Sequence, residues 1–416
     1  MIDPKLLLEH FDEVRANAQR RKCAIDFDTL AEVHKLCRQM TVEVEELRAK
    51  RNKLSKECKD NPAARDEVRQ LKDVLGRKEA ELDKQQSKLQ QMLDFLPNML
   101  ADDVPDGNLD LDNVELRKVG TIPTFDFPVR DHQELGEMLG ILDIARGAKV
   151  AQSGYYYWKG KGAVLAQSLF FWVQRELVKR GFTLFMTPCL AKERTLYGTG
   201  YLPFFADQTY SLEGEDLALI GTSEQTLVGY HADDCLEEAE LPLRYTAFTP
   251  CFRTESGSYG KASRGIFRVH QFHKVEQIVF CKPEDSVKYH EFCLENEEAL
   301  LQALGLPYHV VNVCVGDLGA PGYKKYDIEA YFPSFGGYRE VTSNTNLTSF
   351  QSRRLNIRYK DGAERDYVHT ISATAATDRM IICIMENFQQ PDGSIIVPEV
   401  LRPYTGFDRI VPKKAK

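Results

Sequence analysis

The chain has 416 residues, of which 43% are hydrophobic and 28% charged, and its formal net charge at pH 7 is -8. These values are ordinary for a globular protein, they exclude fibrous and disordered classes, and the length allows two or three domains. No apolar run is long enough to cross a membrane, and the first residues lack the apolar core of a secretory signal. The ten cysteines form no Cys-x-x-Cys pair, which argues against a zinc ribbon and predicts reduced thiols in a cytoplasmic protein.

Two apolar series with heptad spacing occupy the first hundred residues. One runs from Leu30 to Cys58 and the other from Val68 to Leu96, and each steps alternately by three and four residues. Between them, "KDNPAA" contains the Asn-Pro pair that ends a helix. The pattern predicts an antiparallel coiled-coil hairpin with arms of about 30 residues, or roughly 45 Å each. A spacer or dimerisation coil fits this pattern, and so does an RNA-binding arm, because "LRAKRNKLSKECK" is basic.

A segment rich in Pro, Asp, Asn and Gly follows the hairpin, "LPNMLADDVPDGNLDLDN". It reads as a linker and predicts an N-terminal domain over residues 1–108 and a second domain over 109–416. In the second domain we expect a helix over 132–151, a strand and turn over 154–163, and a long buried helix ending at Gly181.

Several strand-like runs come after that helix, among them "LRYTAFTPCFRTE", "FRVHQFHKVEQIVF" and "KYDIEAYFP". Many of their connections are too short to contain crossover helices. The second domain is therefore predicted to be an α+β fold, a largely antiparallel sheet with helices packed on it.

The stretch "FRTESGSYGKASRGIFRVHQFHKVE" gathers cations, aromatic rings and carboxylates. On antiparallel strands flanking its loop, Arg253 and Glu255 share a face, as do Arg268, Phe272 and Glu276. Such a surface suits a nucleoside triphosphate, because arginine binds phosphate, a phenyl ring stacks on a purine and a carboxylate accepts from its amine. A surface strand pair with ordinary salt bridges is the alternative.

This stretch resembles motif 2, over 250–276, of the class II aminoacyl-tRNA synthetases in the form found in the seryl-tRNA synthetase family. The resemblance covers nearly the whole chain in the family's order: "GFTLFMTP" is similar to motif 1, near 181–190, "LIGTSEQTL" to the Thr-x-Glu segment, and "YREVTSNTN" to a metal and serine strand. Motif 3 would span 369–404, and the hairpin stands where the family carries its tRNA-binding arm.

The resemblance implies an antiparallel-sheet class II catalytic domain preceded by the helical arm. It implies ATP-dependent activation of L-serine to seryl-adenylate, transfer of serine to tRNA(Ser), and a homodimer formed through motif 1. Two alternatives stay open, a paralogue that adenylates an amino acid for a non-tRNA acceptor and a non-catalytic tRNA-binding paralogue.

The resemblance also implies roles for individual residues. Arg253 would hold the α-phosphate and the serine carboxylate, and Arg268 and Arg379 the γ-phosphate; these three are the catalytic candidates. Glu255 would bind the adenine amine and Phe272 the adenine face.

Mg²⁺ and serine have implied ligands too. Glu340 and Ser343 would hold Mg²⁺ and join the ATP site, since this hard ion prefers oxygen donors and substrate phosphates. The implied serine-binding residues are Thr222, Glu224, Arg253, Glu276, Ser372 and Thr374. A pocket of this kind would discriminate against alanine by ~10⁴, because alanine leaves buried polar groups unpaired.

Motif 3 departs from the family pattern. The family usually reads His-Thr-Leu-Asn-Gly-Ser-Gly-Leu-Ala-x-Gly-Arg, whereas "HTISATAATDR" is one residue shorter and has no glycine. Ser372 takes the place of the asparagine. Asp378 stands beside Arg379, and we expect it to neutralise part of the charge meant for phosphate.

Overall fold

The computed structural model describes residues 1–3, 5–57, 62–256 and 264–412, and the chain divides into two compact units, Met1–Pro97 and Asn98–Lys416. Cys58, which closes the first heptad series, and the motif 2 loop 257–263 lie outside the described residues. No helix within the described ranges is both long enough and apolar enough to span a membrane.

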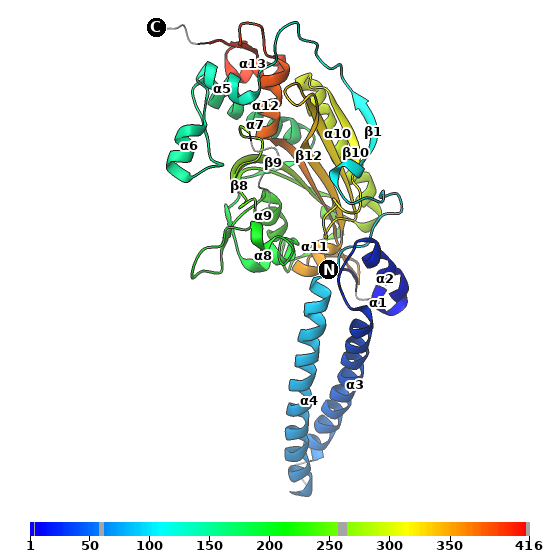
Figure 1. Cartoon of the computed structure of the whole chain (residues 1–416). Coiled ribbons are helices and arrows are strands. Elements are labelled where there is room, and N and C mark those ends of the chain that lie inside the picture. The colour runs from blue at the N-terminus through cyan, green and yellow to red at the C-terminus, as the bar shows by residue number, and fades with distance from the viewer. Residues whose placement is uncertain (4, 58–61, 257–263, 413–416) are drawn as a thin grey trace. The chain divides into compact units, whose positions relative to one another are not determined.

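The first unit is helical, and its two long helices form the predicted hairpin (Figure 1). Its helices are α1 (Leu6–Glu9), α2 (Phe11–Arg20), α3 (Phe27–Glu57) and α4 (Pro62–Asp94). With 31 and 33 residues, α3 and α4 are each roughly 45 to 50 Å long. Met40 and Val44 of α3 and Leu75 and Leu82 of α4 form one buried cluster, so the heptad positions do face the partner helix.

The second unit is built on an eight-stranded sheet, with the strand order β1-β10-β11-β12-β15-β9-β8-β4. Its strands are β1 (Val114–Val119), β4 (Thr183–Phe185), β8 (Leu243–Phe252), β9 (Gln271–Cys281), β10 (Tyr308–Asn312), β11 (Lys324–Phe332), β12 (Gly337–Thr348) and β15 (His369–Thr377). Every neighbouring pair is antiparallel except β4 with β8. The predicted α+β fold is therefore confirmed.

Shorter strands pair outside the main sheet. They are β2 (Leu142–Asp143) with β3 (Tyr157–Trp158), β5 (Leu190–Ala191) with β6 (Ala218–Leu219), β7 (Cys235–Glu237) with β13 (Arg358–Asp361) and β14 (Glu364–Tyr367), and β16 (Ile395–Ile396) with β17 (Arg409–Ile410). The remaining α-helices are α5 (His132–Leu139), α6 (Ile144–Ala151), α7 (Lys161–Lys179), α8 (Glu193–Gly198), α9 (Ser223–Gly229), α10 (Ser286–Leu304), α11 (Phe350–Leu355), α12 (Asp378–Asn387) and α13 (Arg402–Thr405).

The alternation of side chains along β9 separates the main core from the other face of the sheet. Val275 and Val279 belong to the core cluster that α7, α10 and α12 cover. Ile278 and Phe280 point to the opposite face and pack with residues of α9 and α11. Glu276 alternates in step with this second set, so its carboxylate lies on the face away from the main core.

Helix α7 confirms the long buried helix expected from the sequence. Leu165, Leu169 and Leu177 are fully buried at multiples of four residues, which places them on one face of the helix. The chain leaves the helix at Gly181, whose φ of 85° is available to glycine at little steric cost.

Other expectations differ from the structure. The helix expected over 132–151 is broken, because Gly140 ends α5 in a left-handed conformation and β2 follows before α6 begins. The stretch 98–108, assigned to the N-terminal domain from its loop-like composition, belongs to the second unit, where Ala101 and Val104 pack against Val315 and Leu318.

Strand β15 was not recognised as a strand from the sequence. Its core-facing residues are Ile371, Ala373 and Ala375, all buried, and it lies between β12 and β9 at the centre of the sheet. The run does contain the β-branched residues Thr370, Ile371, Thr374 and Thr377, but alanine, which is depleted in strands, occupies the buried positions 373, 375 and 376.

Candidate active site

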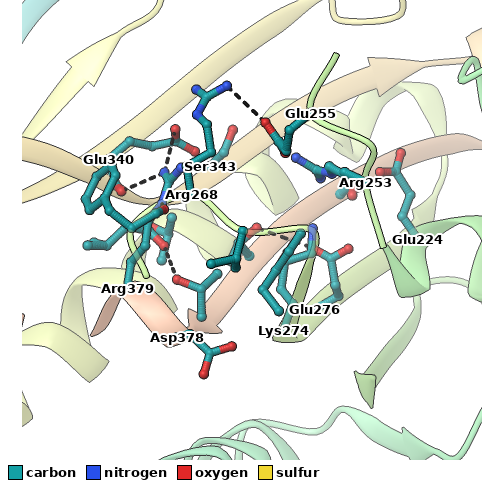
Figure 2. A pocket seen from close by; sticks show the side chains of 18 of the residues that line it. Glu224, Arg253, Glu255, Arg268, Lys274, Glu276, Glu340, Ser343, Asp378 and Arg379 are labelled. Carbon is teal, nitrogen blue, oxygen red and sulfur yellow. Dashed lines mark hydrogen bonds and ion pairs between the residues drawn. The ribbon is translucent and has the colours of Figure 1, made fainter. Parts of the chain in front are cut away.

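A cavity of about 440 Å³ is lined by residues of β9, β12 and β15, the segments around β8 and β9, and the start of α12 (Figure 2). It collects eleven of the twelve site residues predicted from the sequence, namely Glu224, Arg253, Glu255, Arg268, Phe272, Glu276, Glu340, Ser343, Ser372, Thr374 and Arg379. The twelfth, Thr222, lies beside the cavity and donates its hydroxyl to Glu276.

The strands place motif 2 only partly as expected. Phe272 and Glu276 do lie on β9 at even spacing, and both line the cavity. Arg268 precedes the strand, and Arg253 and Glu255 follow the end of β8, so loop conformation rather than strand pleat directs these three side chains. The φ of Glu255 is 51°, an uncommon value for a residue that carries a Cβ.

Each of the three predicted catalytic arginines has an aromatic or carboxylate neighbour inside the cavity. The Arg253 guanidinium lies 5.2 Å from the centre of the Phe272 ring. Arg268 Nη1 donates to Glu255 Oε2 at 3.0 Å. A guanidinium that is hydrogen-bonded to a carboxylate in a partly enclosed site keeps its position while remaining able to exchange that carboxylate for a phosphate oxygen.

Arg379 is held by four contacts, one of which is the hydrogen bond from its Nε to the backbone oxygen of Phe267 at 3.3 Å. Its Nη1 donates to the carboxylate of Glu340 at 3.0 Å and to the backbone oxygen of the same residue at 2.9 Å, and its guanidinium lies 4.5 Å from the Phe267 ring centre. Burial alone would raise the pKa of Glu340, but Arg379 and Lys325 hold this pKa below its usual value. Glu340 is therefore an anion beside a cation at physiological pH.

The oxygen donors near Glu340 fit a hard divalent cation. Ser343 stands three residues further along β12 and pairs with Asp327 of β11. Within the described residues, the buried Oδ1 of Asp327 makes no hydrogen bond. Carboxylate and hydroxyl oxygens that leave room for substrate phosphates are the kind of donor set that Mg²⁺ takes.

The opposite end of the cavity is organised around Glu276. This buried carboxylate accepts from the hydroxyls of Thr222 and Thr374, the latter at 3.2 Å, and lies 2.5 Å from Lys274 Nζ. Thr222 also accepts from the backbone N–H of Glu224 at the first turn of α9. The result is a small polar recess with several hydrogen-bonding groups.

Glu224 is the second carboxylate of this recess. It accepts from the Tyr201 hydroxyl at 3.1 Å and from Gln351 Nε2 at 2.7 Å. Burial, followed by the nearby charge of Glu276, raises the pKa of Glu224 above its usual value. Two adjacent carboxylates of this kind attract a ligand ammonium, which relieves their mutual repulsion.

Lys274, Lys325 and Tyr201 are polar cavity residues that were not assigned to the site from the sequence. Lys274 has the same even spacing on β9 as Phe272 and Glu276, so the strand period alone could have found it. Lys325 and Tyr201 stand in stretches that resemble the family, "GYKKYDIEAYFP" and "LYGTGYLPFF", but no local pattern distinguishes them from their neighbours.

Asp378 does not neutralise Arg379 in the way its position in the chain suggested. Its carboxylate accepts from Trp158 Nε1 at 3.1 Å and from the backbone N–H of His273 at 2.6 Å. The hydrogen bonds of Arg379 go to Glu340 and to the backbone oxygen of Phe267.

Comparison with known proteins gives one consistent answer across the chain. The family model for the tRNA synthetase class II core domain (G, H, P, S and T) matches residues 208–388, and that for the seryl-tRNA synthetase N-terminal domain matches residues 1–100. A serine-tRNA ligase of Dictyoglomus turgidum is 43% identical, with 100% of both chains covered. A serine-tRNA ligase of Treponema denticola is 41% identical, over 99% of this chain and 100% of the relative.

Two solved structures are also similar. Seryl-tRNA synthetase from Pyrococcus horikoshii complexed with ATP superposes with a TM-score of 0.94 at 37% identity, with 100% of each chain covered. Cytoplasmic serine-tRNA ligase from Naegleria fowleri in complex with AMP has a TM-score of 0.87 at 31% identity, over 97% of this chain and 96% of the other.

Proposed function

The chain belongs to the seryl-tRNA synthetase family of class II aminoacyl-tRNA synthetases, and we propose that it activates L-serine with ATP and transfers the serine to tRNA(Ser). One observation carries the proposal. The guanidinium groups of Arg253, Arg268 and Arg379 line the same cavity as the polar recess around Glu276. A triphosphate and a small amino acid can therefore meet in one enclosed space.

In the first half-reaction a serine carboxylate oxygen attacks the α-phosphorus of ATP. A new phosphorus–oxygen bond forms the mixed anhydride seryl-adenylate, and the bond to the β-phosphate breaks with release of diphosphate. Such a displacement needs alignment and neutralised charge more than a covalent nucleophile. Arg253 stands between the two ends of the cavity and is assigned to both the α-phosphate and the serine carboxylate.

At the end of the cavity proposed for ATP, the binding groups are side chains that already pair with one another. Glu255 is assigned to the adenine amine, Phe272 to the adenine face, and Arg268 and Arg379 to the γ-phosphate. Incoming phosphate would replace Glu255 as the partner of Arg268, which frees this carboxylate for the amine.

Glu340 and Ser343 are assigned to Mg²⁺, which, when bound, supplies neutralisation of phosphate charge. The pairing of Glu340 with Arg379 places this carboxylate next to the proposed γ-phosphate ligand. Ser343 adds a neutral oxygen donor from the same strand.

The recess around Glu276 is assigned to serine. Glu224 and Glu276 balance the ammonium group, and Thr222, Ser372 and Thr374 add hydroxyls to the same small space. Alanine would leave these groups without a partner, and threonine would need more room.

In the second half-reaction a hydroxyl of the terminal ribose of tRNA attacks the serine carbonyl, an ester forms and AMP leaves. The hairpin of the N-terminal domain, formed by α3 and α4, would bind the tRNA body. Support comes from the basic end of α3, where Lys50, Lys53 and Lys56 lie in a stretch that contains few acidic residues.

A homodimer through motif 1 is part of the proposal. Val164, Phe171 and Val178 stand seven residues apart on α7, so they form one exposed apolar stripe. Leu184 lies on β4, the last strand in the sheet order, and Met186 next to it is 99% exposed. A second copy of the chain would cover these side chains. Cytoplasmic location stays a prediction from the cysteine content.

The test is serine-dependent exchange of pyrophosphate into ATP, run in parallel with alanine, threonine and glycine, followed by charging of tRNA(Ser). We expect exchange with serine alone and charging by the same preparation. Exchange without charging would favour a non-tRNA acceptor, and no exchange with any of the four would favour a non-catalytic tRNA-binding protein.

A further inference from the structure

Asp378 is a buried carboxylate to which the proposed reaction gives no role. It is the first residue of α12, it is 3% exposed, and it lies beside both the active-site cavity and a second, largely apolar cavity of about 560 Å³. Trp158 and His273 line that second cavity and contact the carboxylate directly.

The contacts of Asp378 join three segments that are distant in the sequence. Oδ1 accepts from the indole N–H of Trp158 in β3 at 3.1 Å, and Oδ2 accepts from the backbone N–H of His273 in β9 at 2.6 Å. His273 Nδ1 lies 3.3 Å from the same Oδ2. Both carboxylate oxygens thus face N–H donors, as buried polar groups generally do.

The bond to His273 continues the ladder between two central strands. Thr377 of β15 pairs with Lys274 of β9, and the next backbone N–H along β9 belongs to His273. Asp378 satisfies this donor with its side chain at the point where β15 becomes α12. The start of the helix is thereby fixed against β9, which carries Phe272 one residue away.

Arg379 follows directly and points its guanidinium the other way. It contacts Glu340 inside the cavity (Figure 2). Its guanidinium also lies 4.5 Å from the centre of the Phe267 ring. A side chain with four rotatable bonds holds a precise position only when its backbone is fixed. Small displacements of a charged group weaken its binding to a phosphate.

We propose that Asp378 is a positioning residue, which ties the start of α12 to β9 and β3 and thereby places Arg379 for the triphosphate. This inference rests on the proposed assignment of Arg379 to ATP. It predicts that Asp378 affects nucleotide affinity through Arg379 and leaves serine affinity almost unchanged, because the contacts of Glu276 do not involve α12.

The test is the dissociation constant of ATP, measured by titration calorimetry without serine, for the full-length chain. Asp378→Asn keeps the shape but turns one acceptor oxygen into an NH₂ group, which faces either the indole or the backbone donor. We expect ATP binding to weaken about tenfold and serine binding to change less than twofold. Asp392→Asn is the matched control, since it removes an exposed carboxylate paired with Arg409 and should change ATP binding less than twofold.

Two further variants separate positioning from other effects. Trp158→Phe removes one donor and should weaken ATP binding about threefold, with no further loss when it is added to Asp378→Asn. In the Arg379→Ala background, Asp378→Asn should change ATP binding less than twofold. If the tenfold loss persists there, or if Asp378→Asn binds ATP normally, the inference is overturned.

Failure of the inference can be told apart from failure of the proposed function. If Arg379→Ala itself binds ATP normally, the assignment of Arg379 falls and the role of Asp378 falls with it. If Arg379→Ala weakens binding while Asp378→Asn does not, only the positioning role is lost. Should Asp378→Asn fail to fold, judged by its thermal unfolding midpoint, Trp158→Phe and its combination with Arg379→Ala decide the question.

Discussion

On the hairpin, Arg48 and Glu79 meet at 2.7 Å with 53% and 35% of their side chains exposed, whereas in the cavity Lys274 and Glu276 meet at 2.5 Å with 10% and 1% exposed. The first pair is hydrated and contributes little to stability. The second pair is buried away from water, so each charged side chain is stabilised mainly by the opposite charge of the other. Exposed side chains of the hairpin can therefore change their ion-pair partners easily. The charged side chains of the cavity keep theirs and stay in fixed positions.

The largest expected effect lies at the centre of the cavity. Arg253→Ala should lower serine-dependent pyrophosphate exchange by ~10³ or more, because it removes the one cation proposed to contact both substrates. Exchange kinetics at several serine and ATP concentrations measure this loss. Arg77→Ala on the exposed surface of α4 is the matched control and should exchange normally; near-normal exchange by Arg253→Ala would contradict the assigned role.

Shortening the hairpin should separate the two half-reactions. Deleting residues 41–54 and 67–80 removes two heptads from each helix and keeps the apolar register. We expect kcat/KM for charging of tRNA(Ser) to fall by ~10², since phosphate contacts are lost, while exchange stays within twofold. Equal loss of exchange and charging would make the hairpin a structural element rather than a tRNA-binding one.

Removing one charge of the buried pair should destabilise the fold. Glu276→Gln leaves Lys274 as a buried cation without its carboxylate, and the free energy of unfolding should fall by about 3 kcal/mol. Denaturant unfolding measures the change, and a double-mutant cycle with Lys274→Met should recover part of it. A loss below 0.5 kcal/mol would place this pair in the same class as those of the hairpin.

A pH effect should come from the core of the second unit. Burial lowers the pKa of His290 to about 4, and its Nε2 lies 3.0 Å from the backbone oxygen of Asn344. Because the unfolded chain takes up this proton near pH 6.5 and the folded chain does not, stability is complete above pH 6.5 and falls towards pH 4. At pH 5 the loss should be about 2 kcal/mol.

The variant His290→Gln isolates that contribution. Its free energy of unfolding should depend less on pH between 7 and 5 than that of the unaltered chain, measured by denaturant unfolding at each pH. Parallel pH profiles for the two proteins would show that His290 is protonated in the folded state as readily as in the unfolded one.

The smallest expected effect is on the hairpin surface. Arg48→Ala removes the exposed pair with Glu79, and the free energy of unfolding should change by less than ~1 kcal/mol. Circular dichroism during thermal unfolding measures it. A loss as large as that of Glu276→Gln would remove the contrast between the two regions.

Periodicity was sufficient to predict the elements that bury one regular face. The heptads gave α3 and α4, and apolar spacing gave α7, because side-chain burial in these helices follows the helical period. Periodicity was insufficient for β15, where alanine occupies three buried positions. This strand is held in the sheet by its pairing with β12 on one edge and β9 on the other. Periodicity also missed the break at Gly140, since the flanking residues of α5 and α6 continue an apolar pattern across it.

The residues assigned to the site were chosen mainly through the resemblance of motifs, and the pairings between them could not be predicted in this way. Even spacing placed Phe272 and Glu276 on one face, but it also placed Arg268 on a strand that begins three residues later. The partnership of Asp378 with Trp158 joins residues 220 positions apart, and adjacency to Arg379 suggested a different partner. Contacts of this range depend on the complete fold, which local pattern does not contain.

A crystal structure with serine and an ATP analogue that has a methylene group between the α- and β-phosphorus atoms tests the central claim most directly. We predict that the guanidinium groups of Arg253, Arg268 and Arg379 lie within hydrogen-bonding distance of the phosphate oxygens, with the serine ammonium between Glu224 and Glu276. Guanidinium groups turned away from the phosphates, or a nucleotide bound outside this cavity, would contradict the account.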